Sequence, residues 1–349
     1  MRALFFVAPG QLSVMDVPDP EPGPGDLIVA VDVALTCGTD LKAYLRGHRL
    51  FKPPMPFGHE FAGTVVRVGS GVDRFRVGDR VAAANSAPCG SCSACKQGET
   101  GLCDDLDKHL NWGAFAERAR IPAPIVRTNT FHIPDHLAAS TAAALEPLAT
   151  VVHGVESARL RLAGTVAILG ATGAIGQLFV QVLRLAGASR IIAVGRSTRR
   201  LAQTTVLGAD VALGVPDATP ERLRAETAGV GPDLVVDATG LPEMWELGAA
   251  LARRGGTMLL FGGCASGTTV TFDTGRLHYD ALTVRGVFHH TPRSVEAAFR
   301  LLAAGRVQVE PILEDRSDLE GVERLLERMA RREIVKAAVY PCGHADGAA

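Results

Sequence analysis

Hydrophobic and polar residues change their rhythm once along this chain. Up to about residue 125, short apolar runs rich in Val and Ala are separated by Gly, Pro and Asp, which is typical of β-strands joined by turns. The runs that predict strands are Arg2–Val7, Leu27–Leu35, Phe61–Val68, Arg80–Ala84 and Ala114–Ile121. We therefore expect the first part of the chain to be rich in β-structure.

A different pattern begins near residue 138, where a helix is predicted over Leu137–Glu156. Apolar strands then alternate with helices, which predicts a parallel sheet covered on both faces. The predicted strands are Val166–Leu169, Ile191–Val194, Leu234–Asp237, Met258–Phe261 and Leu282–Phe288, and the first two helices are Gly176–Ala186 and Arg199–Leu207. From about residue 289 two helices, near Val295–Ala304 and Leu319–Arg331, precede a closing strand at Val335–Tyr340.

Length and composition narrow the class of protein. The 349 residues suggest about two domains, and 47% apolar residues are enough for sizeable cores. A net charge of −1 and 5% aromatic residues argue against a nucleic-acid or anionic-membrane binder. With no run long enough to span a membrane and no signal-peptide core, we expect a cytoplasmic protein with reduced cysteines, for which a cysteine cluster suggests metal.

Four of the seven cysteines form such a cluster. Two-residue gaps between Cys89, Cys92 and Cys95 let the thiolates converge on one ion, and glycines before Cys103 and after Cys89 let the loop wrap around it. Four thiolates in a closed tetrahedral shell are typical of a structural zinc site, which leaves no open position for catalysis. An iron–sulfur cluster is an alternative. A zinc ribbon for nucleic acid is another, although the two separated cysteine pairs and the basic surround of such a ribbon are missing here.

A glycine-rich turn joins the first apolar strand of the alternating region to its helix. The sequence Gly170-Ala-Thr172-Gly173-Ala174-Ile175-Gly176 would let the backbone approach a pyrophosphate placed at the helix N-terminus. Its position between strand and helix favours dinucleotide binding over an ordinary tight turn, which is the other interpretation.

The end of the next strand indicates which dinucleotide is bound. Proteins that bind NAD usually place Asp or Glu there for the ribose 2′-hydroxyl, but this chain has Gly195 followed by Arg196. Arginines at a helix N-terminus oppose the helix dipole, so their presence at Arg196 and Arg200, with Ser197 between, is better explained by an anion. The 2′-phosphate of NADP is such an anion, and the alternative is a solvated basic turn.

Several motifs together make the chain resemble the zinc-dependent medium-chain dehydrogenases, close to their sorbitol, threonine and aminocyclitol dehydrogenase branch. The motifs are Cys37-Gly-Thr39-Asp40, Gly58-His59-Glu60, the four-cysteine segment, Gly113–Glu117, Leu145-Glu146-Pro147 and the glycine turn. The resemblance runs from Met1 to about Pro341 and implies an α/β fold. In that fold a GroES-like, β-rich catalytic domain (1–150, completed by 289–349) joins a Rossmann domain with a doubly wound parallel sheet (151–288).

The resemblance also implies a second, catalytic zinc. Its ligands would be Cys37 and His59 with Glu60 or Glu146, a set that leaves an open place for water or substrate. Thr39 would bond the substrate oxygen and carry its proton away, although Lys42 stands where the family often has His. Further cofactor contacts would come from Ala238, Thr239 and Phe288.

The resulting hypothesis is an alcohol dehydrogenase with two zinc ions per chain. It would transfer a hydride between NADP, rather than NAD, and a secondary alcohol or ketone: a polyol, a sugar or an aminocyclitol. The alternatives are a zinc-free quinone or enoyl reductase of the same superfamily, which the longer glycine turn favours, and a non-catalytic NADP-sensing protein. The resemblance further implies a homodimer or homotetramer that involves no nucleic acid or membrane.

Overall fold

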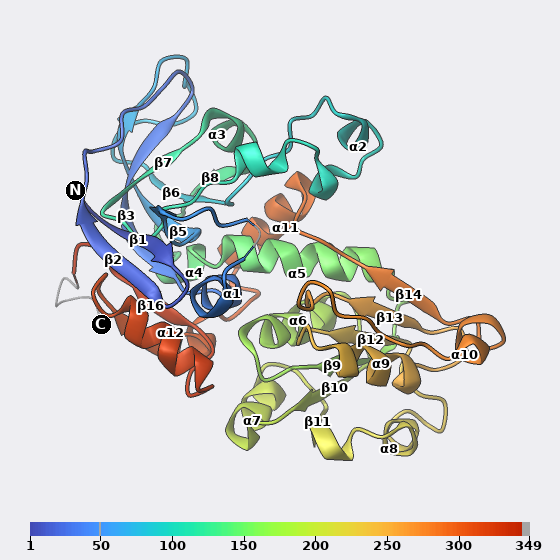
Figure 1. Ribbon diagram of the computed structural model, residues 1–349. Coiled ribbons are helices and arrows are strands. Elements are labelled where there is room, and N and C mark those ends of the chain that lie inside the picture. The colour runs from blue at the N-terminus through green and yellow to red at the C-terminus, as the bar shows by residue number, and fades with distance from the viewer. Residues whose placement is uncertain (49, 344–349) are drawn as a thin grey trace. The chain divides into compact units, whose positions relative to one another are not determined.

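The chain folds into two units, each built around sheets of its own. The computed structural model describes residues 1–48 and 50–343. The first unit contains Met1–Ala149 and His290–Ala349, and the second contains Thr150–His289 (Figure 1).

The first unit is rich in short strands. Its elements before the second unit are β1 (Arg2–Ala8), β2 (Gln11–Asp16), β3 (Leu27–Leu35), α1 (Gly38–Arg46), β4 (Met55–Pro56), β5 (Glu60–Val68), β6 (Arg80–Ala83), α2 (Ser93–Lys96), β7 (Arg118–Ile121), α3 (Ala123–Asn129), β8 (Thr130–His132) and α4 (Ala139–Ala142). After the second unit it adds α11 (Pro292–Ala303), β15 (Asp315–Ser317), α12 (Val322–Ala330) and β16 (Ala337–Val339). Three strands form a small sheet in the order β2-β1-β4, and seven form the main sheet, in the order β15-β16-β3-β5-β6-β8 with β7 also paired to β3.

The antiparallel pair β3 and β5 is the centre of the main sheet. β3 is buried along most of its length and β5 over its first half, and both strands place apolar side chains in the core of the unit. The register pairs Leu35 with Glu60 at one end and Leu27 with Val68 at the other. Because α1 begins just after β3 ends, and β5 begins at Glu60, this pairing brings the Cys37 and His59 segments to the same end of the sheet.

The helix predicted over Leu137–Glu156 is wrong in one respect: it is two helices. Leu137 lies in a turn, α4 ends at Ala142, and α5 (Leu145–Ala158) starts again after Ala143 and Ala144. Pro147 explains the break, because a proline ring clashes with the carbonyl four residues earlier and lacks an N–H. Starting the helix at Leu145 places Pro147 in the first turn, where neither defect matters.

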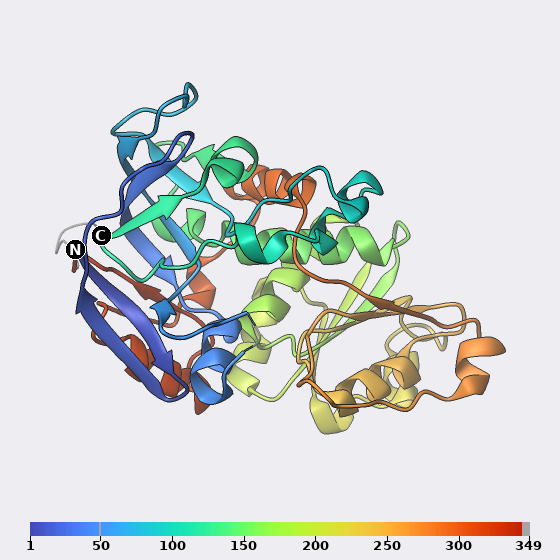
Figure 2. The same ribbon diagram turned by 45° about the horizontal axis from the view of Figure 1, so that its top comes forward.

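The second unit holds a six-stranded parallel sheet, which confirms the parallel sheet predicted from the alternating pattern. Its elements are β9 (Thr165–Leu169), α6 (Ala174–Leu185), β10 (Arg190–Gly195), α7 (Thr198–Val206), β11 (Val211–Gly214), α8 (Pro220–Ala225), β12 (Leu234–Asp237), α9 (Pro242–Leu251), β13 (Thr257–Leu260), α10 (Thr274–His278) and β14 (Thr283–Gly286). The strand order is β11-β10-β9-β12-β13-β14 (Figures 1 and 2). The chain winds outward from β9 to β11 and then returns to β12 on the other side of β9, so the order reverses beside β9.

This reversal fixes where a ligand can bind in the second unit. In open parallel sheets, ligands bind outside the carboxyl ends of the strands where the order reverses. Here that place follows Leu169, where the glycine-rich turn leads from β9 into α6. The strands β9, β10 and β12 are buried along nearly their whole length, so the sheet is a rigid support for the turn.

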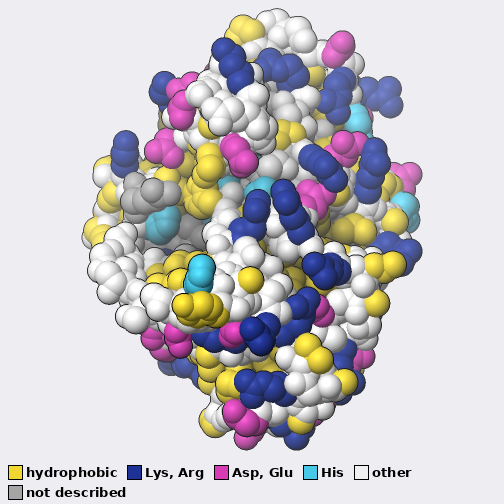
Figure 3. Space-filling view, turned by 90° about the vertical axis from the view of Figure 1, so that its right-hand side faces the viewer, with side chains coloured by type: hydrophobic (Ala, Val, Ile, Leu, Met, Phe, Trp, Pro, Cys, Tyr) yellow, Lys and Arg dark blue, Asp and Glu magenta, His cyan; other side chains and the backbone are white. Residues whose placement is uncertain are grey.

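Charged side chains of both signs are scattered over the face of the molecule drawn in Figure 3. Figure 3 shows Lys and Arg side chains interspersed with Asp and Glu on one face, in keeping with the net charge of −1. Among residues 1–48 and 50–343, no helix has the length and apolar character needed to cross a membrane.

The close contact of β3 and β5 gives a first testable prediction. A Cβ added at Gly63 would lie 2.1 Å from the carbonyl oxygen of Ala30 and 2.6 Å from Cγ1 of Val29. We expect Gly63→Ala to lower the free energy of unfolding by about 1–3 kcal/mol, the usual cost of overpacking. Gly263→Ala is the control, because no atom lies within 4 Å of its added Cβ. Equal denaturation midpoints for the two variants would contradict this packing.

Candidate functional site

The first turn of α1 positions Cys37. Cys37 is the N-cap of this helix: its Sγ accepts the Thr39 amide at 3.4 Å, and its own amide donates to Oδ2 of Asp40 at 2.9 Å. The main-chain amide of Asp40 also donates to the Cys37 side chain, and together with the bond from the Cys37 amide to Oδ2 of Asp40 this forms a capping box. The thiol is therefore held at a defined place, and Thr39 lies beside it, half-buried.

The orientation of the His59 ring is set by the backbone at Gly58 and by a contact with Asp40. Gly58 has φ +83°, a left-handed conformation that a side chain would strain, and an added Cβ would meet the ring of Phe115 at 2.7 Å. Nδ1 of the buried His59 lies 3.1 Å from Oδ1 of Asp40. This contact leaves Nε2 as the ring nitrogen available to a metal, as is usual for a histidine ligand held by a carboxylate.

Glu60 completes a group of three possible metal ligands. Sγ of Cys37, a ring nitrogen of His59 and a carboxylate oxygen of Glu60 all lie within 4.8 Å of one another. Glu60 is fully buried, and among the described residues its Oε1 has no hydrogen-bond partner. An orphaned buried oxygen is costly, and a cation at this place would remove that cost.

Lys336 holds the other oxygen of Glu60. Its Nζ lies 2.5 Å from Oε2 of Glu60 and donates to the carbonyl oxygen of Thr36 at 2.8 Å, and all of these groups are buried. Burial raises the pKa of Glu60, and the ammonium of Lys336 opposes that shift. Burial alone would lower the pKa of Lys336, but Glu60 reverses the direction and raises it.

Glu146 lies close to these residues but in a different group. Its carboxylate lies within 4.8 Å of a ring nitrogen of His290, and the Cys37 group does not include it. Burial raises the pKa of Glu146 to about 7, partly opposed by the charge of a protonated His59. Of the two carboxylates that the sequence left open as ligands, Glu60 is therefore the one that the geometry favours.

These donors suit a divalent zinc ion. A thiolate, an imidazole and one carboxylate are typical ligands of a catalytic zinc, and they leave a fourth position for another molecule. Burial alone would favour the neutral ring of His59, but the carboxylate of Asp40 and the thiolate of Cys37 outweigh it and raise its pKa. The two negative groups that raise this pKa would stabilise a metal cation in place of the proton.

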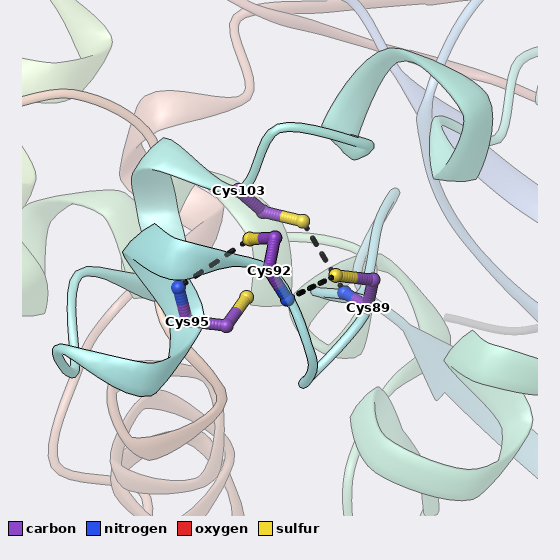
Figure 4. A group of neighbouring side chains, drawn as sticks. All are labelled: Cys89, Cys92, Cys95 and Cys103. Carbon is purple, nitrogen blue, oxygen red and sulfur yellow. Dashed lines mark hydrogen bonds between the residues drawn. The ribbon is translucent and has the colours of Figure 1, made fainter.

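The four cysteines of the α2 segment form the second group. All four sulfurs lie within 4.8 Å of one another, and Figure 4 shows them pointing inward from their loop. Main-chain amides donate to three of them: Cys89 to Sγ of Cys103, Cys92 to Sγ of Cys89, and Cys95 to Sγ of Cys92, at 3.3, 3.3 and 3.4 Å. Such hydrogen bonds from main-chain amides stabilise thiolates and fix the positions of the ligands around a metal.

The thiol pKa values within this group diverge strongly. The amides of Ser91 and Cys92 lower the pKa of Cys89 to about 6. Burial and hydrogen bonding to Cys92 raise the pKa of Cys95 to about 12. Four crowded thiols cannot all ionise without a cation among them, so the group fits a closed zinc site with no position for substrate.

In the second unit, the glycine turn lies against the end of β10. The amides of Gly170 and Ala171 both donate to the carbonyl oxygen of Val194, at 3.0 and 2.9 Å. A Cβ at Gly176 would lie 2.3 Å from the carbonyl oxygen of Gly170, so this glycine is needed for the close contact of helix and strand. A Cβ at Gly173 would meet only that same oxygen, at 3.4 Å, which leaves the mouth of the turn free for a phosphate group.

The other predicted cofactor residues of this unit follow the carboxyl ends of β12 and β14. Thr239 follows β12, and its amide and hydroxyl both donate to Oδ1 of the buried Asp237, at 3.0 and 2.6 Å. The amide of Ala238 donates to the carbonyl oxygen of Leu169 at 2.9 Å, which ties this loop to the end of β9. Phe288 follows β14 and is 43% exposed.

The basic residues after β10 differ in exposure. Arg196 is exposed, whereas Arg200 is buried. Ser197 caps α7 by accepting the Arg200 amide at 3.4 Å. Of the two arginines that the sequence suggested for an anion, Arg196 therefore has the more accessible side chain.

Two residues to which the sequence assigned no role are central to the first group. Asp40 appeared there only as part of a motif, yet its spacing of three from the N-cap Cys37 is that of a capping box. Lys336 was missed, although a lysine inside the apolar closing strand was a signal, because a buried lysine needs a partner.

The strand predicted over Ala114–Ile121 is wrong in its first half. Ala114 to Glu117 is not regular strand, since β7 begins only at Arg118.

Comparisons with known proteins agree with this geometry. Residues 23–135 match the alcohol dehydrogenase GroES-like domain family, and residues 174–304 match the zinc-binding dehydrogenase family. The chain is 28% identical to sorbitol dehydrogenase of Bacillus subtilis (98% of this chain, 97% of the relative) and 33% identical to L-threonine 3-dehydrogenase of Symbiobacterium thermophilum (98% of each). A solved zinc-binding dehydrogenase from Sinorhizobium meliloti 1021, bound to NADP, superposes with a TM-score of 0.89 at 32% identity, covering 97% of this chain and 99% of that one. The expected fold class, a GroES-like domain with a Rossmann domain, is confirmed.

The two groups of ligands predict different results from similar substitutions. We expect the purified protein to contain about two zinc ions per chain. Cys37→Ser should lose about one zinc and the activity but stay folded, because serine is also a good N-cap for α1. Cys95→Ser should instead destabilise the protein, since metal binding at a structural site contributes to folding. Metal analysis and thermal unfolding of both variants test this, and equal destabilisation would contradict the two roles.

Proposed function

Because the chain belongs to the zinc-type medium-chain alcohol dehydrogenase family, we propose that it transfers a hydride between a polyhydroxylated secondary alcohol and NADP. The observation that carries this proposal is the group of Cys37, His59 and Glu60, with a donor set suited to a catalytic zinc. When bound, zinc would polarise the alcohol oxygen as a Lewis acid, and the nicotinamide would accept the hydride.

The residues of the chain would prepare the alcohol and remove its proton. Cys37, His59 and Glu60 would hold the metal, while Asp40 keeps the His59 ring in one orientation. Thr39, which lies beside Cys37, would accept the hydroxyl proton of the substrate through its own hydroxyl and pass it towards solvent. The positive charges of the bound metal and Lys336 would balance the negative charges of Cys37, Glu60 and Asp40, so that this group stays close to neutral with the metal.

The proposed preference for NADP rests on the end of β10. Gly195 has no side chain with which to bind a ribose 2′-hydroxyl, and the exposed Arg196 follows it directly. A guanidinium binds a phosphate through charge-assisted hydrogen bonds, whereas the same group gains little from a hydroxyl. The NADP-bound protein from Sinorhizobium meliloti supports the proposal as a relative of similar fold.

The proposed substrate class rests on the polar surroundings of the Cys37 group. Buried carboxylates at Glu60 and Glu146 suit a ligand rich in hydroxyl groups, or one that carries an amine. Phe57 and Phe115, two aromatic residues close to His59 in the sequence or in space, are fully buried in the core. Similarity to a sorbitol dehydrogenase supports the same class.

We also propose a homodimer or homotetramer joined through β14. This strand is at one edge of the six-stranded sheet and pairs only with β13 in the described chain. Its side chains are largely exposed, so a second copy could extend the sheet there. Light scattering on the purified protein measures the number of subunits directly.

The cofactor proposal predicts a kinetic preference. A charge-assisted hydrogen bond contributes about 1.5–3 kcal/mol, so kcat/KM should be roughly 10- to 100-fold higher with NADP⁺ than with NAD⁺. Arg196→Leu should remove most of this preference by weakening NADP⁺ alone, whereas Arg306→Leu, an exposed arginine of the first unit, should not change it. A higher kcat/KM with NAD⁺ in the unaltered enzyme would refute the proposal.

The substrate proposal predicts the outcome of one competition assay. We expect polyols and cyclitols to give higher kcat/KM than linear and benzylic alcohols when all are oxidised with NADP⁺. A value that is uniformly higher for the simple alcohols, and that rises with alkyl length, would instead indicate a hydrophobic pocket and would show the substrate class to be wrong.

A further inference from the structure

Gly195 is not required by its own backbone. It is the last residue of β10 and pairs in parallel register with Gly214, in the extended conformation of the strand. It is absent from the glycines with positive φ, so any L-amino acid could adopt its backbone conformation. A reason for glycine at this buried position must therefore come from the space around it.

Thr172 fills that space. A Cβ added at Gly195 would lie 2.3 Å from Cγ2 of Thr172, 2.7 Å from its Oγ1 and 3.1 Å from its Cβ. Carbon atoms in good contact are separated by about 3.5–4.0 Å, so the first of these distances is a severe clash. The side chain of Thr172 thus occupies the space that a side chain at position 195 would need.

Rotation of Thr172 cannot relieve this clash. A side chain has three staggered positions on its Cβ, and threonine fills two of them with heavy atoms in every rotamer. Both Cγ2 and Oγ1 face Gly195 in the structure, so two of the three positions point that way. Any rotamer therefore leaves at least one heavy atom towards Gly195.

The backbone of the turn is also held in place. The Gly170 and Ala171 amides both bond to the carbonyl oxygen of Val194, the residue before Gly195. On the other side, Nε2 of the buried Gln177 donates to the carbonyl oxygen of Thr172 at 3.4 Å. Moving Thr172 away from β10 would break these bonds, so the competition is resolved by keeping residue 195 small.

We infer that Thr172 is a specificity-determining residue, because it excludes from position 195 the acidic side chain with which NAD-binding folds hold the ribose 2′-hydroxyl. This inference rests on the proposed preference for NADP and deepens it. The preference is set by a pair, Thr172 with Gly195, in addition to the charge of Arg196. An aspartate placed at 195 without a change at 172 would clash before it could select a cofactor.

A double-mutant cycle on the cofactor-free, full-length protein tests the steric part. We expect Gly195→Ala to lower Tm by about 2–10 °C when Thr172 is present. With Thr172→Ala as the background, the same substitution should lower Tm by less than half as much, because only the 3.1 Å contact between the two Cβ atoms remains. Equal losses in the two backgrounds would overturn the inference.

Thr172→Val is the matched control for shape. Valine also carries two heavy atoms on its Cβ. Gly195→Ala should therefore lower Tm as much in the Thr172→Val background as it does when residue 172 is threonine. If the Thr172→Val background tolerates Gly195→Ala as well as the Thr172→Ala background does, the effect is not one of shape and the inference fails.

Cofactor binding tests the functional part. Gly195→Asp with Arg196→Leu should bind NAD⁺ weakly, and adding Thr172→Ala should tighten the Kd for NAD⁺ at least tenfold, measured by titration calorimetry. An unchanged Kd would overturn the role of Thr172 in specificity. If the unaltered enzyme prefers NAD⁺, the proposed function is wrong, but the steric conflict measured by the Tm cycle is unaffected. If instead Gly195→Ala lowers Tm equally with and without Thr172, only the inference about Thr172 is wrong.

Discussion

The carboxylate of Asp40 is the contact on which the candidate metal centre depends. One oxygen accepts the amide of Cys37 and so fixes the start of α1, while the other faces Nδ1 of His59 at the start of β5. A single buried side chain thereby joins a helix cap to a strand end and sets the direction of two possible ligands. The antiparallel pairing of β3 and β5 brings these segments together, and Asp40 contacts both of them within that arrangement.

Charge explains how so many ionisable groups can be buried in one place. Asp40, Glu60, Glu146 and Lys336 are nearly inaccessible to solvent, and burying unpaired charges is costly. Lys336 pairs with Glu60, Asp40 with His59, and a divalent cation between Cys37, His59 and Glu60 would balance the remaining negative charge. The four-cysteine group meets the same constraint differently, since it offers only thiolates, and with zinc it would form a closed, anionic site that holds a loop.

The sequence predicted the fold class well, because apolar strands alternating with helices admit few architectures other than a parallel sheet. It also named the residues that the structure brings together in each ligand group, since Cys-x-x-Cys spacing and the Gly58-His59-Glu60 motif are local signals. Contacts between distant segments could not be predicted in this way. Lys336 lies 276 positions after Glu60 in the sequence, and nothing near either residue reveals the pair. The clash between Thr172 and an added Cβ at Gly195 likewise depends on how closely a turn packs against a neighbouring strand, which no periodicity reports. The break between α4 and α5 was predictable from Pro147, and the helical character of the surrounding alanines concealed it.

Zinc affinity in an Asp40→Asn variant tests the central claim most directly. Asparagine has a similar shape but only one carbonyl oxygen, so it cannot serve both the Cys37 amide and His59 as the carboxylate does. Competition with a chelator should show that the zinc at the Cys37 group is bound roughly 10- to 100-fold more weakly than in the unaltered protein, as expected when the partner of a histidine ligand is lost. The zinc of the four-cysteine group should keep its affinity and serves as the internal control for correct folding. If both zinc ions are bound as tightly in the variant as in the unaltered protein, Asp40 does not organise the metal centre.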